Sequence, residues 1–190
     1  EDFYAWTQQF KKRAVSEGIP QEVADRALDG LELDETVIKL DRKQPESKIT
    51  LEKYLSNTIN TRRINKGREL IAEHNDLLNN IGRAYGVQPN YLVSFWGIES
   101  DFGAHKGNFS VVRSLATLAY EGRRRDFFSD ELIAALKIIT DENMDPLELT
   151  GSWAGAMGNC QFMPTTYLRY AVDADGENFR QLVQTTAVIP

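Results

Sequence analysis

Glu99 lies within the segment NYLVSFWGIESDFG (residues 90–103), where its neighbours make it a candidate for acid chemistry. If this segment is helical, Leu92, Phe95, Trp96 and Glu99 share one face, because residues three, four and seven apart align on a helix. That face is otherwise apolar, so we expect the carboxyl of Glu99 to be poorly solvated and to hold a proton near neutral pH. A neutral carboxylic acid in apolar surroundings is what general-acid cleavage of a glycosidic bond requires.

The same pattern has a second interpretation, in which Glu99 is a structural acid paired with an arginine or a backbone donor. Asp101 does not complete a pair of acids, because two residues along a helix turn the side chain by about 200°. A second carboxylate must therefore come from elsewhere in the chain, or the chemistry uses one acid. The helix is expected to end at Gly103, which places Glu99 near the negative end of the helix dipole and further favours its protonated form.

A second unusual stretch is GSWAGAMGNCQFMPTTY (residues 151–167). Its glycines and alanines allow the backbone to pass close to another surface. Ser152, Asn159 and Gln161 offer a hydroxyl and two amides, and the aromatic residues among them are Trp153, Phe162 and Tyr167. Sugars suit such a surface, since their hydroxyls form hydrogen bonds and their C–H faces pack on aromatic rings. The alternative is a glycine-rich connector whose aromatic side chains fill the core.

The elements that must hold these residues are predicted to be helices. Apolar periodicity and helix-ending signals predict them over residues 3–18, 20–28, 51–59, 61–85, 89–103, 111–120 and 127–140, and a further helix begins at Pro164. Residues 37–40 form only a short apolar patch, and residues 41–47 have the composition of a polar loop. Since no run alternates convincingly as a strand, the fold class is predicted to be mainly α, with little or no sheet.

Composition limits the classes of function. The chain has 190 residues, 42% of them hydrophobic and 26% charged, which is typical of a globular protein with one sizeable domain or two small ones. A net charge of −6 and a pI near 5.1 argue against general nucleic-acid binding. No apolar stretch is long enough to span a bilayer, and no signal sequence opens the chain, although an exported mature protein would look the same. Cys160 is the single cysteine, and two scattered histidines do not suggest a metal or triad site.

Two long motifs resemble one known family. WGIESDFG (residues 96–103) followed by GSWAGAMGNCQFMPTTYLRYAVD (residues 151–173) is similar to the lytic murein transglycosylases of the membrane-bound B type, glycoside hydrolase family 103. Residues 114–136, and the segment 40–46 with the pair at 54–55, also resemble the family, so that the likeness covers residues 1 to about 175.

The resemblance implies a lysozyme-like, mainly helical fold. It also implies cleavage of the β-1,4 bond between N-acetylmuramic acid and N-acetylglucosamine in peptidoglycan, with release of a 1,6-anhydromuramoyl end. No cofactor is expected. The implied partner is the glycan strand, the implied location is the periplasm or cell envelope of a bacterium, and lipid anchoring of the whole protein is left open.

Six residues receive roles from this resemblance. Glu99 matches the family's catalytic acid and base, and the substrate-contacting positions are matched by Ser152, Gln161, Tyr54, Arg123 and Arg124. The assignment of Tyr54 depends on a short flanking motif. The resemblance places Arg123 and Arg124 near the stem peptide. The alternative interpretation is that these two arginines belong to a solvated run of charged residues. In the implied mechanism the N-acetyl group of the substrate replaces a second carboxylate, which is a recognised exception to the two-carboxylate scheme.

Three features depart from the family pattern. Cys160 is interpreted as a small filler, because no base for a nucleophile is found. Residues 173–184 begin like a calcium loop but lack the glycine and glutamate that such a loop needs, so no metal is predicted. We therefore predict a catalytic domain over residues 1–178, incomplete relative to the family, and an atypical tail over residues 179–190. The rival functions are a muramidase of the same fold, a glycan-binding module without turnover, and a structural helical domain.

Overall fold

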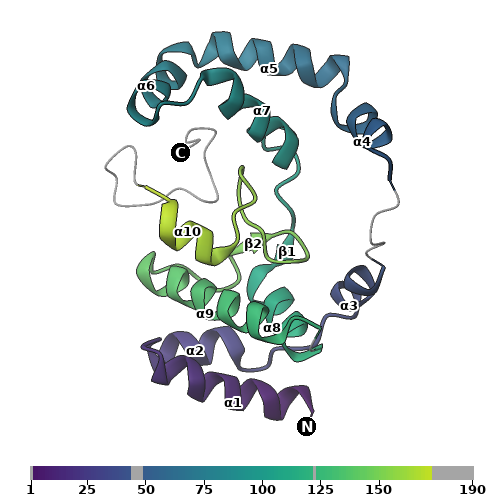
Figure 1. Ribbon diagram of the computed structural model, residues 1–190. Coiled ribbons are helices and arrows are strands. Elements are labelled where there is room, and N and C mark those ends of the chain that lie inside the picture. Colours follow the sequence, from purple (N-terminus) through teal and green to yellow (C-terminus); the bar gives the residue numbers. More distant parts are fainter. Residues whose placement is uncertain (1, 44–48, 122, 173–190) are drawn as a thin grey trace.

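The computed structural model describes residues 2–43, 49–121 and 123–172. Over these residues the chain forms ten helices and one pair of short strands (Figure 1). The helices are α1 (Phe3–Ser16), α2 (Gln21–Leu28), α3 (Glu35–Arg42), α4 (Leu51–Thr58), α5 (Thr61–Glu73), α6 (Asn75–Tyr85), α7 (Pro89–Ser100), α8 (Val111–Glu121), α9 (Arg125–Asp141) and α10 (Pro164–Tyr170), and the strands are β1 (Phe109–Ser110) and β2 (Thr150–Gly151). The predicted mainly α fold is confirmed. None of the described helices is both long and apolar enough to cross a membrane.

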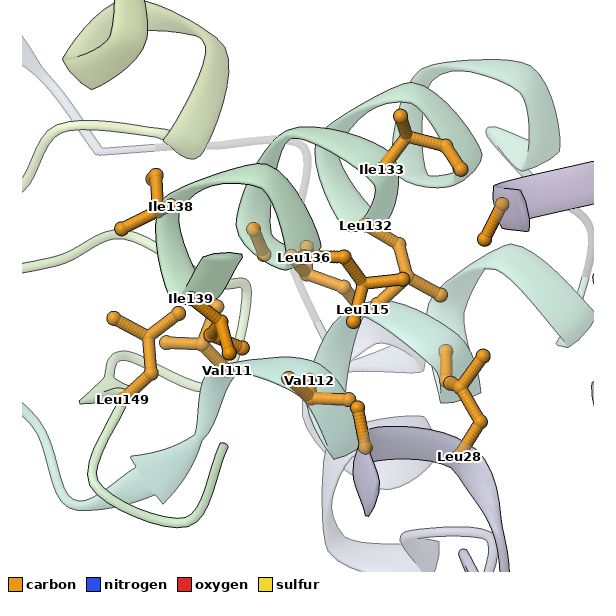
Figure 2. Close-up of a cluster of buried hydrophobic side chains, with 14 of the residues drawn as sticks. Leu28, Val111, Val112, Leu115, Leu132, Ile133, Leu136, Ile138, Ile139 and Leu149 are labelled. Atoms are coloured by element: carbon orange, nitrogen blue, oxygen red, sulfur yellow. The ribbon is translucent and has the colours of Figure 1, made fainter. Parts of the chain in front are cut away.

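The larger of two hydrophobic cores is built around α8 and α9, which pack against each other and are flanked by α1, α2 and α10. Leu132, Leu136 and Ile139 recur at helical spacing along α9 and are fully buried. Figure 2 shows Leu132 and Leu136 beside Leu115 of α8 and Ile139 beside Val111, with Leu28 of α2 at the edge of the cluster. This core supports the segment that enters β2, through Leu149, and the helix α10 within the second motif, through Tyr167.

A smaller core joins α5, α6 and α7. Leu70, Leu78, Val93 and Trp96 are buried there, and Phe102 packs against them from beyond the end of α7. In Figure 1 these three helices lie above the larger core, and β1 and β2 lie between the two groups. α4 precedes this group and has no buried side chain of its own.

The predicted single helix over residues 61–85 is wrong. His74 has φ −106° and ψ 25°, which ends α5, and α6 starts at the next residue. The His74 ring stands 6.4 Å from the Trp96 ring, measured between centroids. The bend therefore lets α5 and α6 both pack on α7, which a continuous helix would prevent.

The apolar patch predicted at residues 37–40 belongs to a helix, α3, that the sequence analysis missed. The Asp34 carboxylate accepts hydrogen bonds from the amides of Thr36 and Val37, which is a standard N-terminal cap. The predicted polar loop at 41–47 is thus helical at residues 41 and 42, and residues 44–48 lie outside the described part of the chain.

The strand pair was also not expected from the sequence. Phe109 pairs with Gly151 and Ser110 with Thr150 in an antiparallel ladder. Gly107 permits this approach, because it has φ 87° and a Cβ atom there would stand 2.1 Å from the carbonyl oxygen of Gly151. As a result the residues that follow α7 run directly beside the second motif.

Candidate active site

Glu99 is the penultimate residue of α7, and its side chain is exposed. The prediction that an apolar face buries it is therefore wrong. Of the three residues expected to share that face, only Trp96 is buried, whereas Leu92 is half-buried and Phe95 is 58% exposed. Periodicity gives the face of the helix on which a residue lies, but not what covers that face. Glu99 is a solvated carboxyl group one helical turn from an exposed aromatic ring.

Three consecutive left-handed residues follow α7. Asp101, Phe102 and Gly103 have φ values of 52°, 59° and 86°, and the first two adopt a conformation that is costly for residues with a side chain. The buried side chain of Ser100 holds this turn, because its Oγ accepts a hydrogen bond from the Gly103 amide at 3.0 Å. The helix consequently ends at Ser100 rather than at Gly103, and the turn that replaces its last residues fixes the backbone next to Glu99.

Phe102 returns from this turn to the smaller core. Its ring meets Trp96 edge to face, with centroids 5.7 Å apart. It also lies over Gly97, where a Cβ atom would stand 2.7 Å from the ring. Packing of the partly buried ring therefore offsets part of the cost of the backbone conformation.

Asp101 turns toward α5. Nη2 of Arg62 donates to both carboxylate oxygens at 2.7 Å, and Nε of Arg63 donates to Oδ1 at 3.2 Å. The hydrogen bond from Arg62 lowers the pKa of Asp101 below its usual value, with help from Arg63 and against the opposing effect of desolvation. Asp101 is therefore an ionised group held by α5, and not a second acid for Glu99.

Ser152 starts a tight turn in the second motif. Its amide donates to the carbonyl of Ala156 at 2.8 Å, and its Oγ accepts from the Ala156 amide at 3.0 Å. Gly155 completes the turn at φ 88°, where a Cβ atom would stand 2.5 Å from Leu115. Since the Ser152 hydroxyl acts as an acceptor in this contact, its hydrogen is available to a ligand.

Gln161 lies further along the same loop and adopts φ 49°. Its Nε2 donates to the carbonyl oxygens of Gly158 at 3.0 Å and Lys106 at 3.2 Å. These bonds use both amide hydrogens, so Oε1 is presented as an acceptor. The side chain of Asn159 approaches Gly103, where a Cβ atom would stand 2.7 Å from Oδ1. Residues 158–161 therefore pack on the segment that directly follows Glu99.

Cys160 brings the same loop within electrostatic range of Glu99. Burial raises the pKa of the Cys160 thiol to about 11, and the charge of Glu99 contributes to the rise. The thiol is therefore protonated at neutral pH, which agrees with its interpretation as a filler rather than a nucleophile.

The other predicted residues have different neighbours in the described structure. Tyr54 lies on α4 and is 52% exposed. Nε of Arg123 pairs with Asp41 of α3 at 3.5 Å, and the Arg124 guanidinium lies 4.0 Å from the centre of the Phe127 ring. Both arginines follow α8, which ends beside α3 in Figure 1. The structure thus joins the segments that carry Glu99, Ser152 and Gln161, while substrate contacts of Tyr54, Arg123 and Arg124 stay predictions.

Sequence reasoning missed two features near Glu99. The first is the pair Arg62 and Arg63, which looks like ordinary surface charge in the first turn of a helix. The second is an apolar groove of about 420 Å³ between α5 and α7, lined in part by Ile64, Ile98 and Phe102. No sequence signal marks either of them, because both arise from contacts between α5 and the segment that contains α7 and its final turn.

Comparison with known proteins defines the class of this fold and site. The family described as "Transglycosylase SLT domain" matches residues 2–188. The chain therefore belongs to the Transglycosylase SLT domain family. The resemblance inferred from the two motifs is confirmed.

Solved structures agree with this assignment. SltB3 from Pseudomonas aeruginosa, in complex with NAG-NAM-pentapeptide, is 41% identical with a TM-score of 0.92, and the match covers 98% of this chain and 50% of SltB3. SltB1 from the same organism, a soluble lytic transglycosylase, is 30% identical with a TM-score of 0.88, and the match covers 95% of this chain and 61% of SltB1. The predicted lysozyme-like transglycosylase fold is confirmed.

A curated relative matches a shorter region. Membrane-bound lytic murein transglycosylase B from Escherichia coli (strain K12) is 43% identical over 106 residues, which are 55% of this chain and 29% of that protein. The chain thus spans about half the length of SltB3 and less of the curated relative.

Proposed function

We propose that this chain is a peptidoglycan lytic transglycosylase, which cleaves the β-1,4 bond between N-acetylmuramic acid and N-acetylglucosamine and leaves a 1,6-anhydromuramoyl end. The observation that carries the proposal is the position of Glu99. It lies one residue before the end of α7, beside a loop that offers the Ser152 hydroxyl and the side-chain oxygen of Gln161, in a fold shared with SltB3. SltB3 has been crystallised with NAG-NAM-pentapeptide and with NAG-anhNAM-pentapeptide, and we extend both ligand classes to this chain.

Glu99 would act twice in one turnover. It first gives its proton to the glycosidic oxygen as the bond from the muramoyl C1 breaks, which releases the N-acetylglucosamine hydroxyl. Because Asp101 is held by α5, the N-acetyl group of the muramoyl residue would stabilise the positive charge at C1. The ionised Glu99 then takes the proton of the muramoyl 6-hydroxyl as that oxygen bonds to C1, which closes the anhydro ring and restores the acid.

Because Glu99 is exposed in the free protein, the bound substrate itself would have to keep water away from the carboxyl group. A glycan strand lying across Phe95 and Glu99 would displace the water that now surrounds the carboxyl. The 6-hydroxyl would then be the nearest nucleophile to C1, and water would not compete. The Ser152 hydroxyl and Gln161 Oε1 would form hydrogen bonds with polar groups on the side of the sugar that faces the second motif.

Peptide recognition is assigned to the turn after α8. The Arg123 side chain is 58% exposed although it pairs with Asp41, so its outer face can meet a carboxylate of a stem peptide. Arg124, stacked on Phe127, presents a fixed charge beside it. Tyr54 would add an aromatic surface for a sugar ring. With these roles, residues 1–178 act as the catalytic domain on glycan strands in the periplasm or cell envelope of a bacterium.

Digestion of purified sacculi tests the proposal. Soluble fragments are analysed by mass spectrometry, in which an anhydro end is lighter by one water than a reducing end. The chain should release anhydro fragments, and Glu99→Gln should release none while its circular dichroism and melting temperature remain those of a folded protein. Fragments with reducing ends would identify a muramidase instead.

Two other outcomes would replace the proposal. Binding to sacculi without any fragments would identify a glycan-binding module. The absence of both binding and fragments would identify a structural helical domain. A Glu99→Gln chain with full activity would remove Glu99 from the mechanism.

A further inference from the structure

We infer that Asp101 is a positioning residue for Glu99. Through Arg62 and Arg63 it fixes the end of α7 to α5 and to the end of α4, so that the acid keeps one position relative to Tyr54 and to the loop around Gln161. This inference rests on the proposed function and adds a residue to it.

The first observation is the strength of the attachment. Three hydrogen bonds link Asp101 to the two arginines, and only 11% of the Asp101 side chain is exposed. Charge-assisted bonds of this kind are stronger than neutral ones. The bond from Arg63, which is 22% exposed, is screened less than the two bonds from Arg62, which is 63% exposed. The bonds hold a residue whose backbone, at φ 52°, is in a conformation that the local sequence does not favour. The attachment therefore fixes the turn after Glu99.

The second observation is that Arg63 bridges two helices. While its Nε donates to Asp101, its Nη1 donates to the carbonyl oxygen of Thr58, the last residue of α4. Because α4 has no buried side chain, this bond to its last residue is a direct polar attachment of α4 to α5. A change at Asp101 is thereby transmitted to the helix that carries Tyr54.

The third observation concerns the other side of the turn. Gly103 lies against the Asn159 side chain, and Gln161 donates to the carbonyl of Lys106. The segment 101–106 is therefore held by α5 on one side and by the second motif on the other. If the arginines release Asp101, Glu99 loses its fixed position relative to Gln161, and a displacement of about 1 Å can lower a rate by about 100-fold.

The test compares Asp101→Asn with Asp130→Asn. Asparagine tolerates the left-handed conformation and matches aspartate in shape, so the first change removes mainly the charge. The second change removes the charge from an exposed ion pair with Arg13 that joins α9 to α1, away from α7. On soluble glycan fragments, Asp101→Asn should lower kcat about 10- to 100-fold with less than about a threefold change in KM, and the control should keep both.

Amide hydrogen exchange supplies a second readout. Asp101→Asn should exchange at least about fivefold faster than the control in both residues 51–58 and residues 98–103, because the bridge through Arg63 is weakened at both ends. A merely local structural role would change only the second segment. A kcat equal to that of the control overturns the inference, whatever the exchange shows.

The two proposals fail separately. If the unmodified chain releases no product, the proposed function falls, and hydrogen exchange alone decides the inference. Faster exchange in both segments would then support the coupling of α4 to α7 through Asp101, and exchange equal to that of Asp130→Asn would overturn it.

Discussion

Glu131 connects the larger core to the second motif, and replacing it with glutamine tests how that motif is anchored. This buried carboxylate on α9 accepts two hydrogen bonds from Thr165 at the start of α10. The Thr165 amide donates to Oε2 at 2.9 Å and its hydroxyl to Oε1 at 2.7 Å. Pro164, the preceding residue, has no N–H group, so the Thr165 amide is the first donor of α10 that needs a partner.

The expected magnitude follows from these two bonds. A hydrogen bond to a charged group contributes about 1.5–3 kcal/mol, and an unsatisfied buried donor costs about 1–3 kcal/mol. In Glu131→Gln one oxygen remains, so one bond becomes neutral and the other donor faces an NH₂ group. The glutamine is also relieved of burying a charge, which offsets part of the loss. We expect a decrease of about 2 kcal/mol in the free energy of unfolding, or about 4–8 °C in melting temperature.

Urea unfolding followed by circular dichroism measures this change, with an unchanged m value as the sign that only stability is affected. Thr165→Val removes the hydroxyl alone and should cost about 1 kcal/mol, because the amide bond is retained. Combining the two substitutions should cost less than their sum by about 1 kcal/mol. The control is Glu148→Gln, an exposed residue, for which we expect a change within about 0.5 kcal/mol.

Additive losses in the double variant would refute the reasoning, since additivity means that the carboxylate and the hydroxyl do not interact. A Glu131→Gln chain as stable as the control would do so as well. The result also bears on function. Because α10 begins three residues after Gln161, a loosened Thr165 should weaken glycan cleavage without any change at Glu99.

Three further predictions concern the site and its supports. Gly155→Ala should destabilise the chain by about 2–4 kcal/mol in urea unfolding, because the new Cβ would strain the left-handed backbone and also collide with Leu115. The control Gly18→Ala also has a left-handed backbone but open space around the Cβ, so it should cost only about 1–2 kcal/mol. Cys160, with a thiol pKa of about 11, should react slowly with iodoacetamide at pH 8, and Glu99→Gln should speed the reaction by lowering that pKa; equal rates would contradict the proximity of the two residues. The pKa of Asp101 is lowered on folding, so the stabilising effect of its ionised carboxylate should be complete above the usual pKa of 3.8 and should be lost as the pH falls through the folded pKa. The difference in free energy of unfolding between the parent chain and Asp101→Asn should therefore narrow below about pH 4.

Local patterns predicted most helices well. The Pro164 start of α10 and the approximate limits of α8 and α9 follow from apolar spacing and helix-ending signals, which depend on nearby residues. The break at His74 was missed because the apolar spacing of residues 61–85 continues through it. The break allows α5 and α6 both to pack near Trp96, and His74 itself lies beside that ring. Trp96 is too far along the sequence to be part of any local pattern around residue 74.

Burial was the less predictable property. The predicted apolar face of α7 was wrong. The residues of α7 that are buried are Val93, Trp96, Gly97 and Ser100. Phe95 and Glu99, on the predicted face, are exposed. The hydrogen bonds of Asp101 to Arg62 and Arg63 span 39 and 38 positions, respectively. A sequence pattern shows which residues need a hydrogen-bond or packing partner. Which residue becomes that partner depends on the tertiary fold.

The two motifs that revealed the family do not make the site without residues between them. Gly107 belongs to neither motif, yet its positive φ and missing side chain let residues 107–110 lie against β2. This contact brings the two segments together, so that the Gln161 side chain donates a hydrogen bond to the Lys106 carbonyl and the Asn159 side chain lies against Gly103. The acid is thus supplied by one motif and its polar surroundings by the other. Their spacing depends on a short connector, in which a single methyl group at residue 107 would collide with the backbone of β2.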